Sequence, residues 1–280
     1  MMMEAIPQIL GGTRCLVEGK QDDGTPIVLV HGVGMDLYMW DAVAAELRQS
    51  GRGQPHRVIR YDMQGHAGSA KPAGPYCLAD YVAQLDRLAG DLKLERFHLV
   101  GFSMGGLVAQ GYAVHNPGRV DHLVLVNTVY DRTPDERAAI TARVADVRTG
   151  GYPASVEQAI DRWFTPDFRR DHGDTVEAVR KHMLGNDLEP YANAYAVFGS
   201  ADAELVDSVS EIPCPTLVIT GADDQRSTAA MARALAARLP KGQLEIIAGQ
   251  RHLTPLEVPG HLAASIRNFV TGPQATKAAS

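Results

Sequence analysis

The sequence predicts an α/β protein with a mostly parallel central sheet, helices on both faces of the sheet, and an inserted helical segment. Three observations point to this fold. Short apolar runs rich in β-branched residues alternate with amphipathic stretches, a serine between two glycines directly follows one such run, and one long stretch has only helical patterns. The chain has 280 residues, 45% of them hydrophobic, which is enough for one large core.

The apolar runs are predicted strands, and the amphipathic stretches between them are predicted helices. An N-terminal hairpin is expected first, followed by strands at 27–30, 57–61, 97–101, 122–127, 216–220 and 244–247. Helices are expected at 41–49, 78–92, 105–115, 228–239 and 259–270. Strands that alternate with helices form parallel sheets, which bind ligands at the carboxyl ends of their strands.

One region departs from this alternation. Residues 131–212 have several helical patterns and no strand of comparable strength, so we expect a helical lid inserted between two core segments, 1–130 and 213–280. The last ten residues, 271–280, are small and polar, and we expect them to be disordered.

Composition excludes several kinds of function. The net charge is −6 and the Lys and Arg residues are scattered, which argues against a nucleic-acid partner. No secretory signal or membrane-spanning run is evident, so a cytoplasmic protein that binds no membrane is expected. The three cysteines are far apart, so we expect no disulfide framework. The ten histidines lack metal-ligand spacing, so we expect no metal, and we expect no cofactor.

Ser103 is the candidate nucleophile. It lies in Gly101-Phe102-Ser103-Met104-Gly105, which matches Gly-x-Ser-x-Gly and has the strand before it and the helix after it that this motif requires. A sharp turn of this kind exposes the hydroxyl above the sheet, at a backbone strain of about 1–3 kcal/mol.

His252 is the candidate general base for this serine. A hydroxyl needs a base within hydrogen-bond reach whose pKa lies near the working pH, and imidazole meets that need. His252 follows the predicted strand 244–247 and precedes the last helix, a position from which it can reach Ser103. His31 and His66 also lie in loops at strand ends, but both precede the nucleophile in the chain order expected of this arrangement.

A carboxylate is needed to hold the imidazole in one tautomer and to stabilise its charged form. Gly221-Ala222-Asp223-Asp224 follows the strand 216–220 and supplies two adjacent acids. We favour Asp224, because the chain needs room to turn after the glycine. Asp223 remains an alternative and Asp131 a weaker one, because adjacent side chains in a loop cannot be ranked from sequence.

Two backbone N–H groups are candidates for an oxyanion hole. Met104 follows the nucleophile at the start of a helix, and Val33 lies in His31-Gly32-Val33-Gly34, the glycine loop after the first central strand. Each donor aimed at the developing negative charge is worth about 3–4 kcal/mol in the transition state.

Together these motifs resemble the α/β-hydrolase family over nearly the whole chain, and most closely its 3-oxoadipate (β-ketoadipate) enol-lactone hydrolase branch. Asp-Leu-Tyr-Met-Trp-Asp at 36–41, Pro-Ala-Gly-Pro-Tyr at 72–76 and Arg-Trp-Phe-Thr-Pro-Asp-Phe-Arg at 162–169 are similar to segments of that branch. The chain departs from it at several positions, among them His31-Gly32, where that branch often has Asn-Ser. The resemblance implies an α/β-hydrolase fold and a lid that shapes the substrate pocket.

Candidate substrate contacts in the lid follow from this interpretation. Trp163 either lines the pocket or attaches the lid to the core, and both roles remain open. The lid also contains arginines, among them Arg132, Arg143 and Arg162. These side chains either pair with a substrate carboxylate or lie on the solvated surface of their helices.

The resulting hypothesis is a serine hydrolase that cleaves a small carboxylic ester or enol-lactone through an acyl-enzyme and without a cofactor. The catabolism of aromatic or related small acids is a candidate source of that substrate. Two alternatives remain. One is a hydrolase of carbon–carbon bonds in dienoic ring-cleavage products, and the other is a receptor that binds a ligand on the same fold without turnover.

Overall fold

A single sheet forms the centre of the computed structural model, which describes residues 6–21, 23–49 and 56–272. In these residues the sheet has eight strands in the order β1-β2-β4-β3-β5-β6-β7-β8. The strands are β1 (Gln8–Leu10), β2 (Thr13–Glu18), β3 (Ile27–Val30), β4 (Val58–Tyr61), β5 (Phe97–Phe102), β6 (Val120–Val126), β7 (Thr216–Gly221) and β8 (Gly242–Ile247).

The predicted mostly parallel sheet is confirmed. β1 and β2 form the antiparallel N-terminal hairpin, and β2 also pairs antiparallel with β4. Every neighbouring pair from β4 to β8 is parallel. The four residues of β3 are fully buried, as expected for a central strand that helices cover on both faces.

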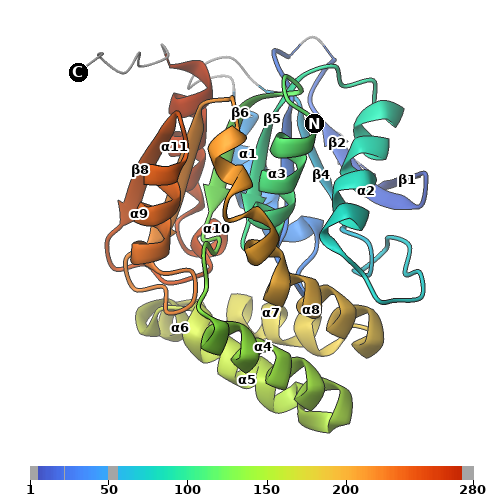
Figure 1. Cartoon of the computed structure of the whole chain (residues 1–280), viewed down its shortest axis with the longest axis vertical. Helices are drawn as coiled ribbons and strands as arrows, with labels where there is room; N and C mark the ends of the chain where they lie inside the picture. The colour runs from blue at the N-terminus through green and yellow to red at the C-terminus, as the bar shows by residue number, and fades with distance from the viewer. Residues whose placement is uncertain (1–5, 22, 50–55, 273–280) are drawn as a thin grey trace.

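Helices flank both faces of the sheet (Figure 1). α1 packs against α11, α2 packs against α3, and α9 packs on β7 and β8. The α-helices that accompany the sheet are α1 (Asp41–Leu47), α2 (Leu78–Asp91), α3 (Met104–His115), α9 (Ala229–Arg238), α10 (Thr254–Glu257) and α11 (Pro259–Thr271), and a 3-10 helix, η1 (Leu37–Trp40), precedes α1.

A helical segment stands between β6 and β7. It contains α4 (Pro134–Asp146), the short π-helical turn η3 (Val147–Gly151), α5 (Tyr152–Trp163), α6 (Pro166–Asp171), α7 (Gly173–Leu184), α8 (Leu188–Leu205) and the 3-10 helix η4 (Ser208–Glu211). Helices α4–α8 gather at one end of the sheet (Figure 1). α4 begins with Thr133 as N-cap and Pro134 in the first turn, and the Glu136 carboxylate accepts a hydrogen bond from Thr133 N–H, which together fix its start.

The structure differs from the expected elements mainly at their ends. β8 begins at Gly242 rather than at 244. It is an edge strand whose first residues are exposed, so its early part lacks the apolar pattern that marks a buried strand. Thr271 is the last residue of α11, which corrects the expectation that the polar tail starts there, while residues 273–280 lie outside the described part.

Across the described residues, no helix has the length and apolar character needed to span a membrane.

Candidate active site

Ser103 lies at a sharp turn between β5 and α3. Its φ and ψ angles are 53° and −114°, a conformation that a non-glycine residue adopts only under strain. Two hydrogen bonds hold the turn: Ser103 N–H donates to Val126 O at 2.9 Å, and Thr128 Oγ1 donates to Ser103 O at 2.8 Å. The neighbouring strand and the loop after it therefore fix the strained serine from both sides.

The glycines of the motif are required by close backbone packing. A Cβ added to Gly101 would lie 2.3 Å from Gly105 O, and one added to Gly105 would lie 2.4 Å from His31 O. Both distances are far below any normal carbon–oxygen contact, and the atoms involved belong to the backbone, which cannot move aside cheaply. The Gly-x-Ser-x-Gly pattern therefore has a steric cause in the contact between β3, β5 and α3.

The structure brings Ser103, His252 and Asp224 together. His252 Nε2 lies 3.2 Å from Ser103 Oγ, and His252 Nδ1 lies 2.7 Å from Asp224 Oδ2. A carboxylate only accepts hydrogen bonds, so Nδ1 carries the proton and Nε2 is left to accept the serine hydroxyl. All three side chains are buried.

Asp224 is held as an anion by several donors. The backbone N–H groups of Arg226 and Ser227 both donate to its Oδ1 at 3.0 Å, and Asn127 Nδ2 donates to its Oδ2 at 2.9 Å. Burial alone raises the pKa of the Asp224 carboxyl. The electrostatic interaction and the hydrogen bond with the His252 ring, with the Arg226 N–H and the Asn127 amide, outweigh that effect and lower the pKa below its usual value.

The alternative acids lie elsewhere. Asp223 is exposed, and its N–H donates to Gln250 O at 2.9 Å, which fixes the turn so that only the next side chain faces His252. Asp131 is also exposed, and it lies beyond the end of β6.

Asn127 is a site residue that the sequence analysis did not identify. It is fully buried directly after β6, with a φ of 46°. Its Oδ1 accepts from Thr254 Oγ1 at 2.7 Å, while its Nδ2 donates to Asp224 and to Arg251 O. Its place at the carboxyl end of a parallel strand is the signal that could have identified it.

The two predicted oxyanion donors belong to the segments that adjoin Ser103. Met104 is the first residue of α3, where helix geometry leaves the N–H without an intrahelical acceptor. Val33 lines the same cavity as Ser103 and His252. A Cβ on Gly32 would lie 2.8 Å from the Phe102 ring, so the glycine lets the Val33 loop approach the serine closely.

His31 and His66, which the sequence placed near the site, hold the Val33 loop. His66 Nε2 accepts from Gly34 N–H at 3.0 Å, and His31 Nε2 accepts from Met63 N–H at 2.8 Å. Burial lowers the pKa of each imidazole to about 3, so both are neutral and can accept these bonds. His66 is therefore a fixed acceptor for the Val33 loop, and His31, itself in that loop, connects the loop to Met63.

Trp163 both lines the cavity and connects the helical segment to the core. Its ring lies 5.8 Å from the His252 ring, centroid to centroid, and its carbonyl accepts from the N–H groups of His252 and Leu253 at 3.0 and 3.2 Å. Two residues later, Thr165 N and Oγ1 donate to the Glu257 carboxylate at 2.9 and 2.6 Å. The loop that contains His252 is therefore hydrogen-bonded directly to the C-terminal end of α5.

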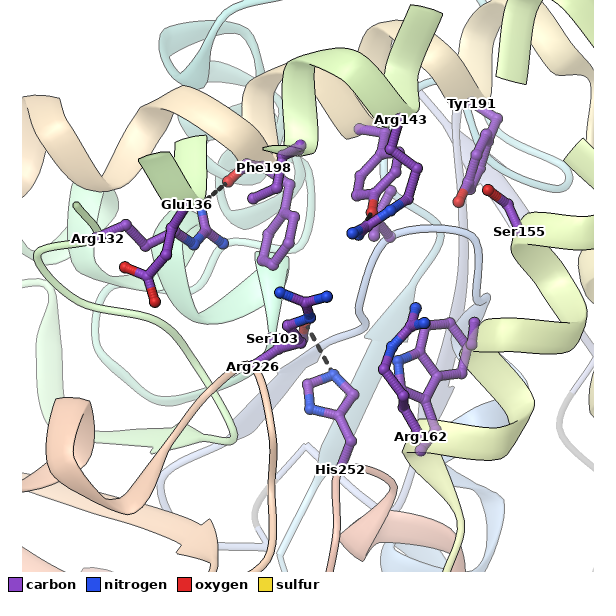
Figure 2. A pocket seen from close by; sticks show the side chains of 15 residues that line it. Ser103, Arg132, Glu136, Arg143, Ser155, Arg162, Tyr191, Phe198, Arg226 and His252 are labelled. Carbon is purple, nitrogen blue, oxygen red and sulfur yellow. Dashed lines mark hydrogen bonds between the residues drawn. The ribbon is translucent and has the colours of Figure 1, made fainter. Parts of the chain in front are cut away.

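A cavity opens above Ser103 and His252, between the core and the helices α4, α5 and α8 (Figure 2). Its lining includes four arginines, namely Arg132, Arg143, Arg162 and Arg226. Arg132, proposed as a substrate contact, is already paired with Asp202 at 3.2 Å and donates to Phe198 O at 2.6 Å. Arg226 was not identified from the sequence because it lies in the loop after Asp224 rather than in the helical segment.

Comparison with known proteins gives the family. Residues 27–265 match the model of the alpha/beta hydrolase family. The chain belongs to the alpha/beta hydrolase family. This range contains the sheet from β3 to β8, the helical segment, Ser103, Asp224 and His252.

Individual alpha/beta hydrolases with known names are similar over most of the chain. The (E)-2-((N-methylformamido)methylene)succinate hydrolase of Acinetobacter baylyi is 32% identical over 86% of this chain and 88% of its own. The 3-oxoadipate enol-lactonase 2 of the same organism is 30% identical over 85% of this chain and 86% of its own. The structure of the enol-lactonase from Burkholderia xenovorans LB400 superposes with a TM-score of 0.84 at 28% identity, and covers 95% of this chain and 100% of that one. The predicted resemblance to enol-lactonases is confirmed.

Proposed function

We propose that this hydrolase cleaves a small carboxylic ester or enol-lactone through an acyl-enzyme on Ser103. The observation that carries the proposal is the continuous line of hydrogen bonds from Asp224 to His252 and from His252 to Ser103, at 2.7 and 3.2 Å. A strained serine with a base and an oriented acid is the arrangement that nucleophilic acyl transfer requires.

The reaction follows from this geometry. Ser103 Oγ attacks the carbonyl carbon as its proton moves to His252 Nε2, and Asp224 stabilises the imidazolium that forms. The N–H groups of Val33 and Met104 donate to the oxyanion of the tetrahedral intermediate. His252 then protonates the leaving oxygen, which departs or, for a lactone, stays attached to the acyl chain.

A second half-reaction releases the product. Water enters the site, gives a proton to His252 Nε2 and attacks the acyl carbon of the ester on Ser103. The second tetrahedral intermediate collapses when the proton passes from His252 to Ser103 Oγ. The acid leaves and the enzyme returns to its starting protonation state, so no cofactor takes part.

A substrate panel tests the proposal. The relatives are named for an enol-lactone and for a succinate derivative, so the panel contains the 3-oxoadipate enol-lactone, aryl esters that carry no, one or two free carboxylates, and a dienoic ring-cleavage product. We expect the lactone or an ester to be turned over, and Ser103→Ala to abolish the turnover. Turnover of the dienoic compound alone would favour carbon–carbon bond hydrolysis, and binding without any turnover would favour the receptor alternative.

A further inference from the structure

The cavity above Ser103 is positively charged although the chain as a whole is acidic. The chain has a net charge of −6, yet the cavity lining contains four arginines and one acid, Glu136. Glu136 Oε2 accepts from Thr133 N–H at 2.8 Å as part of the N-terminal cap of α4. Arg132 pairs with Asp202 at 3.2 Å, a carboxylate that Arg137 also contacts at 3.0 Å. Three arginines of the cavity then remain to be explained.

Arg143, Arg162 and Arg226 have no carboxylate partner among residues 6–21, 23–49 and 56–272. Arg143 Nη1 donates to the Tyr195 hydroxyl at 2.7 Å, and the buried Nε of Arg162 has no hydrogen-bond acceptor at all in that part of the chain. Figure 2 shows these three side chains directed into the cavity from different sides.

The three guanidinium groups also act on one another. Burial lowers the pKa of Arg162, and the positive charges of Arg143 and Arg226 lower it further. Like charges gathered in a half-buried cavity repel each other, so the arrangement is unfavourable unless an anion occupies the cavity.

We propose that the substrate is a dianion with two carboxylates, which Arg143, Arg162 and Arg226 bind. This inference rests on the proposed function, because it takes the bound anion to be the substrate. The charge balance favours an anion of at least two charges: Arg143, Arg162 and Arg226 with Glu136 leave two positive charges, and Arg132 shares the Asp202 carboxylate with Arg137. Guanidinium groups suit this task because each can bind a carboxylate through two parallel hydrogen bonds.

The positions of the three arginines give them a role in orienting the substrate. Arg143 lies on α4 and Arg162 on α5. Arg226 lies in the loop between β7 and α9, and its backbone N–H donates to Asp224. A dicarboxylate held by all three connects the helical segment to the core directly above Ser103. The arginines therefore select substrates by charge and hold the scissile carbonyl near the nucleophile.

Isothermal titration calorimetry at low ionic strength tests the proposal with non-hydrolysable probes. Glutarate is the dianion, butyrate the monoanion, glutaramide the neutral control, and inorganic phosphate a compact anion. We expect wild type to bind glutarate about tenfold more tightly than butyrate, or better, because the second carboxylate adds charge-assisted hydrogen bonds to a guanidinium group. Glutaramide is expected to produce no heat.

Variants assign the binding to the arginines. Arg162→Met and Arg226→Met, each confirmed as folded by circular dichroism, are expected to lose the preference for glutarate. Arg170→Met is the matched control, because Arg170 is an exposed residue of α6 that pairs with Asp167 and Asp171. We expect this variant to retain the preference.

Several results would overturn the proposal. They are equal affinity for glutarate and butyrate, no glutarate binding at millimolar concentration, tighter binding of phosphate than of glutarate, or an unchanged preference in both cavity variants. The calorimetry does not depend on Ser103 as a nucleophile. A failure of the dianion proposal is therefore distinguishable from a failure of the proposed acyl transfer.

Discussion

The Asn127 side-chain amide donates to Asp224 Oδ2 at 2.9 Å, the same oxygen that receives the hydrogen bond from His252. Asn127 in turn is fixed by the Thr254 hydroxyl, which donates to its Oδ1 at 2.7 Å. Asn127, directly after β6, and Thr254, at the start of α10, therefore position Asp224, which in turn orients His252.

Replacing Asn127 tests this role. In Asn127→Ala we expect kcat to fall by about tenfold or more, because the lost bond to a charged group is worth about 1.5–3 kcal/mol. The pKa of Asp224 is expected to rise, since one of the groups that lower it is gone, so activity should be lost at a higher pH during acid titration. Asn116→Ala, at the far end of α3, is the control. An unchanged pH profile of kcat would contradict the positioning role.

The two adjacent acids provide a matched pair of variants. Asp224→Asn is expected to lower kcat by about 10⁴-fold, because the imidazole loses the acceptor that holds its tautomer. Asp223→Asn is expected to keep near wild-type kcat, because Asp223 is exposed and only Asp224 contacts His252. Steady-state kinetics on the best panel substrate measures both, and similar losses in the two variants would contradict the assignment.

His66 is expected to act on catalysis through the Val33 loop. His66→Ala removes the acceptor of the Gly34 N–H, so the adjacent Val33 N–H should lose its fixed direction. We expect kcat to fall by up to about 10²-fold, the lower range for loss of an oxyanion donor, with a smaller change in KM. His115→Ala, at the C-terminal end of α3, is the control. A larger effect on KM than on kcat would show that the loop serves binding instead.

Because His98 is buried, we expect the fold to lose stability in acid. Burial, followed by the charges of His122 and His56, lowers the pKa of His98 to about 3, against about 6.5 in the unfolded chain. The neutral ring therefore contributes stability that is fully present above pH 6.5 and is lost as the pH falls toward 3. His98→Phe keeps a ring at this position and removes the titration.

Urea unfolding at several pH values between 6 and 4 measures this effect. The free energy of unfolding of wild type should fall more steeply with decreasing pH than that of His98→Phe, by about 1.4 kcal/mol per pH unit, which corresponds to one proton. Equal slopes would mean that His98 takes up no proton on unfolding in this range.

The glycines of the motif give a steric prediction. In Gly105→Ala the new methyl group meets the carbonyls of Val30 and His31 at 2.5 and 2.4 Å, so we expect a loss of stability of about 1–3 kcal/mol or more. The methyl group of Gly260→Ala, in the first turn of α11, meets no atom of the described residues within 4 Å, so this variant should be neutral or slightly stabilising. Thermal unfolding of both variants checks this, and equal effects would contradict the steric argument.

The sheet and the turn at Ser103 were predictable because their signals are local. The apolar run 97–101, the glycines two positions before and after Ser103, and the helical pattern after it lie within a few residues of one another. The boundary of β8 was less predictable, because an exposed edge strand does not need the apolar alternation of a buried one.

The rest of the site depends on contacts between distant residues. Asn127 and Asp224 are 97 positions apart, and nothing near either residue indicates that they meet. Asp223 and Asp224 have the same chemistry, and they differ only in the folded loop, where Asp224 is buried and accepts from Arg226, Ser227 and Asn127 while Asp223 is exposed. Arg226 was missed because the expected substrate contacts were sought only in the helical segment.

Intact-mass spectrometry after treatment with a fluorophosphonate tests the central claim most directly, because the reagent reacts with serines activated as nucleophiles. We predict that wild type gains the mass of one adduct, that Ser103→Ala gains none, and that His252→Ala reacts far more slowly. A well-folded wild type that stays unmodified, or an adduct of equal yield on Ser103→Ala, would contradict the account.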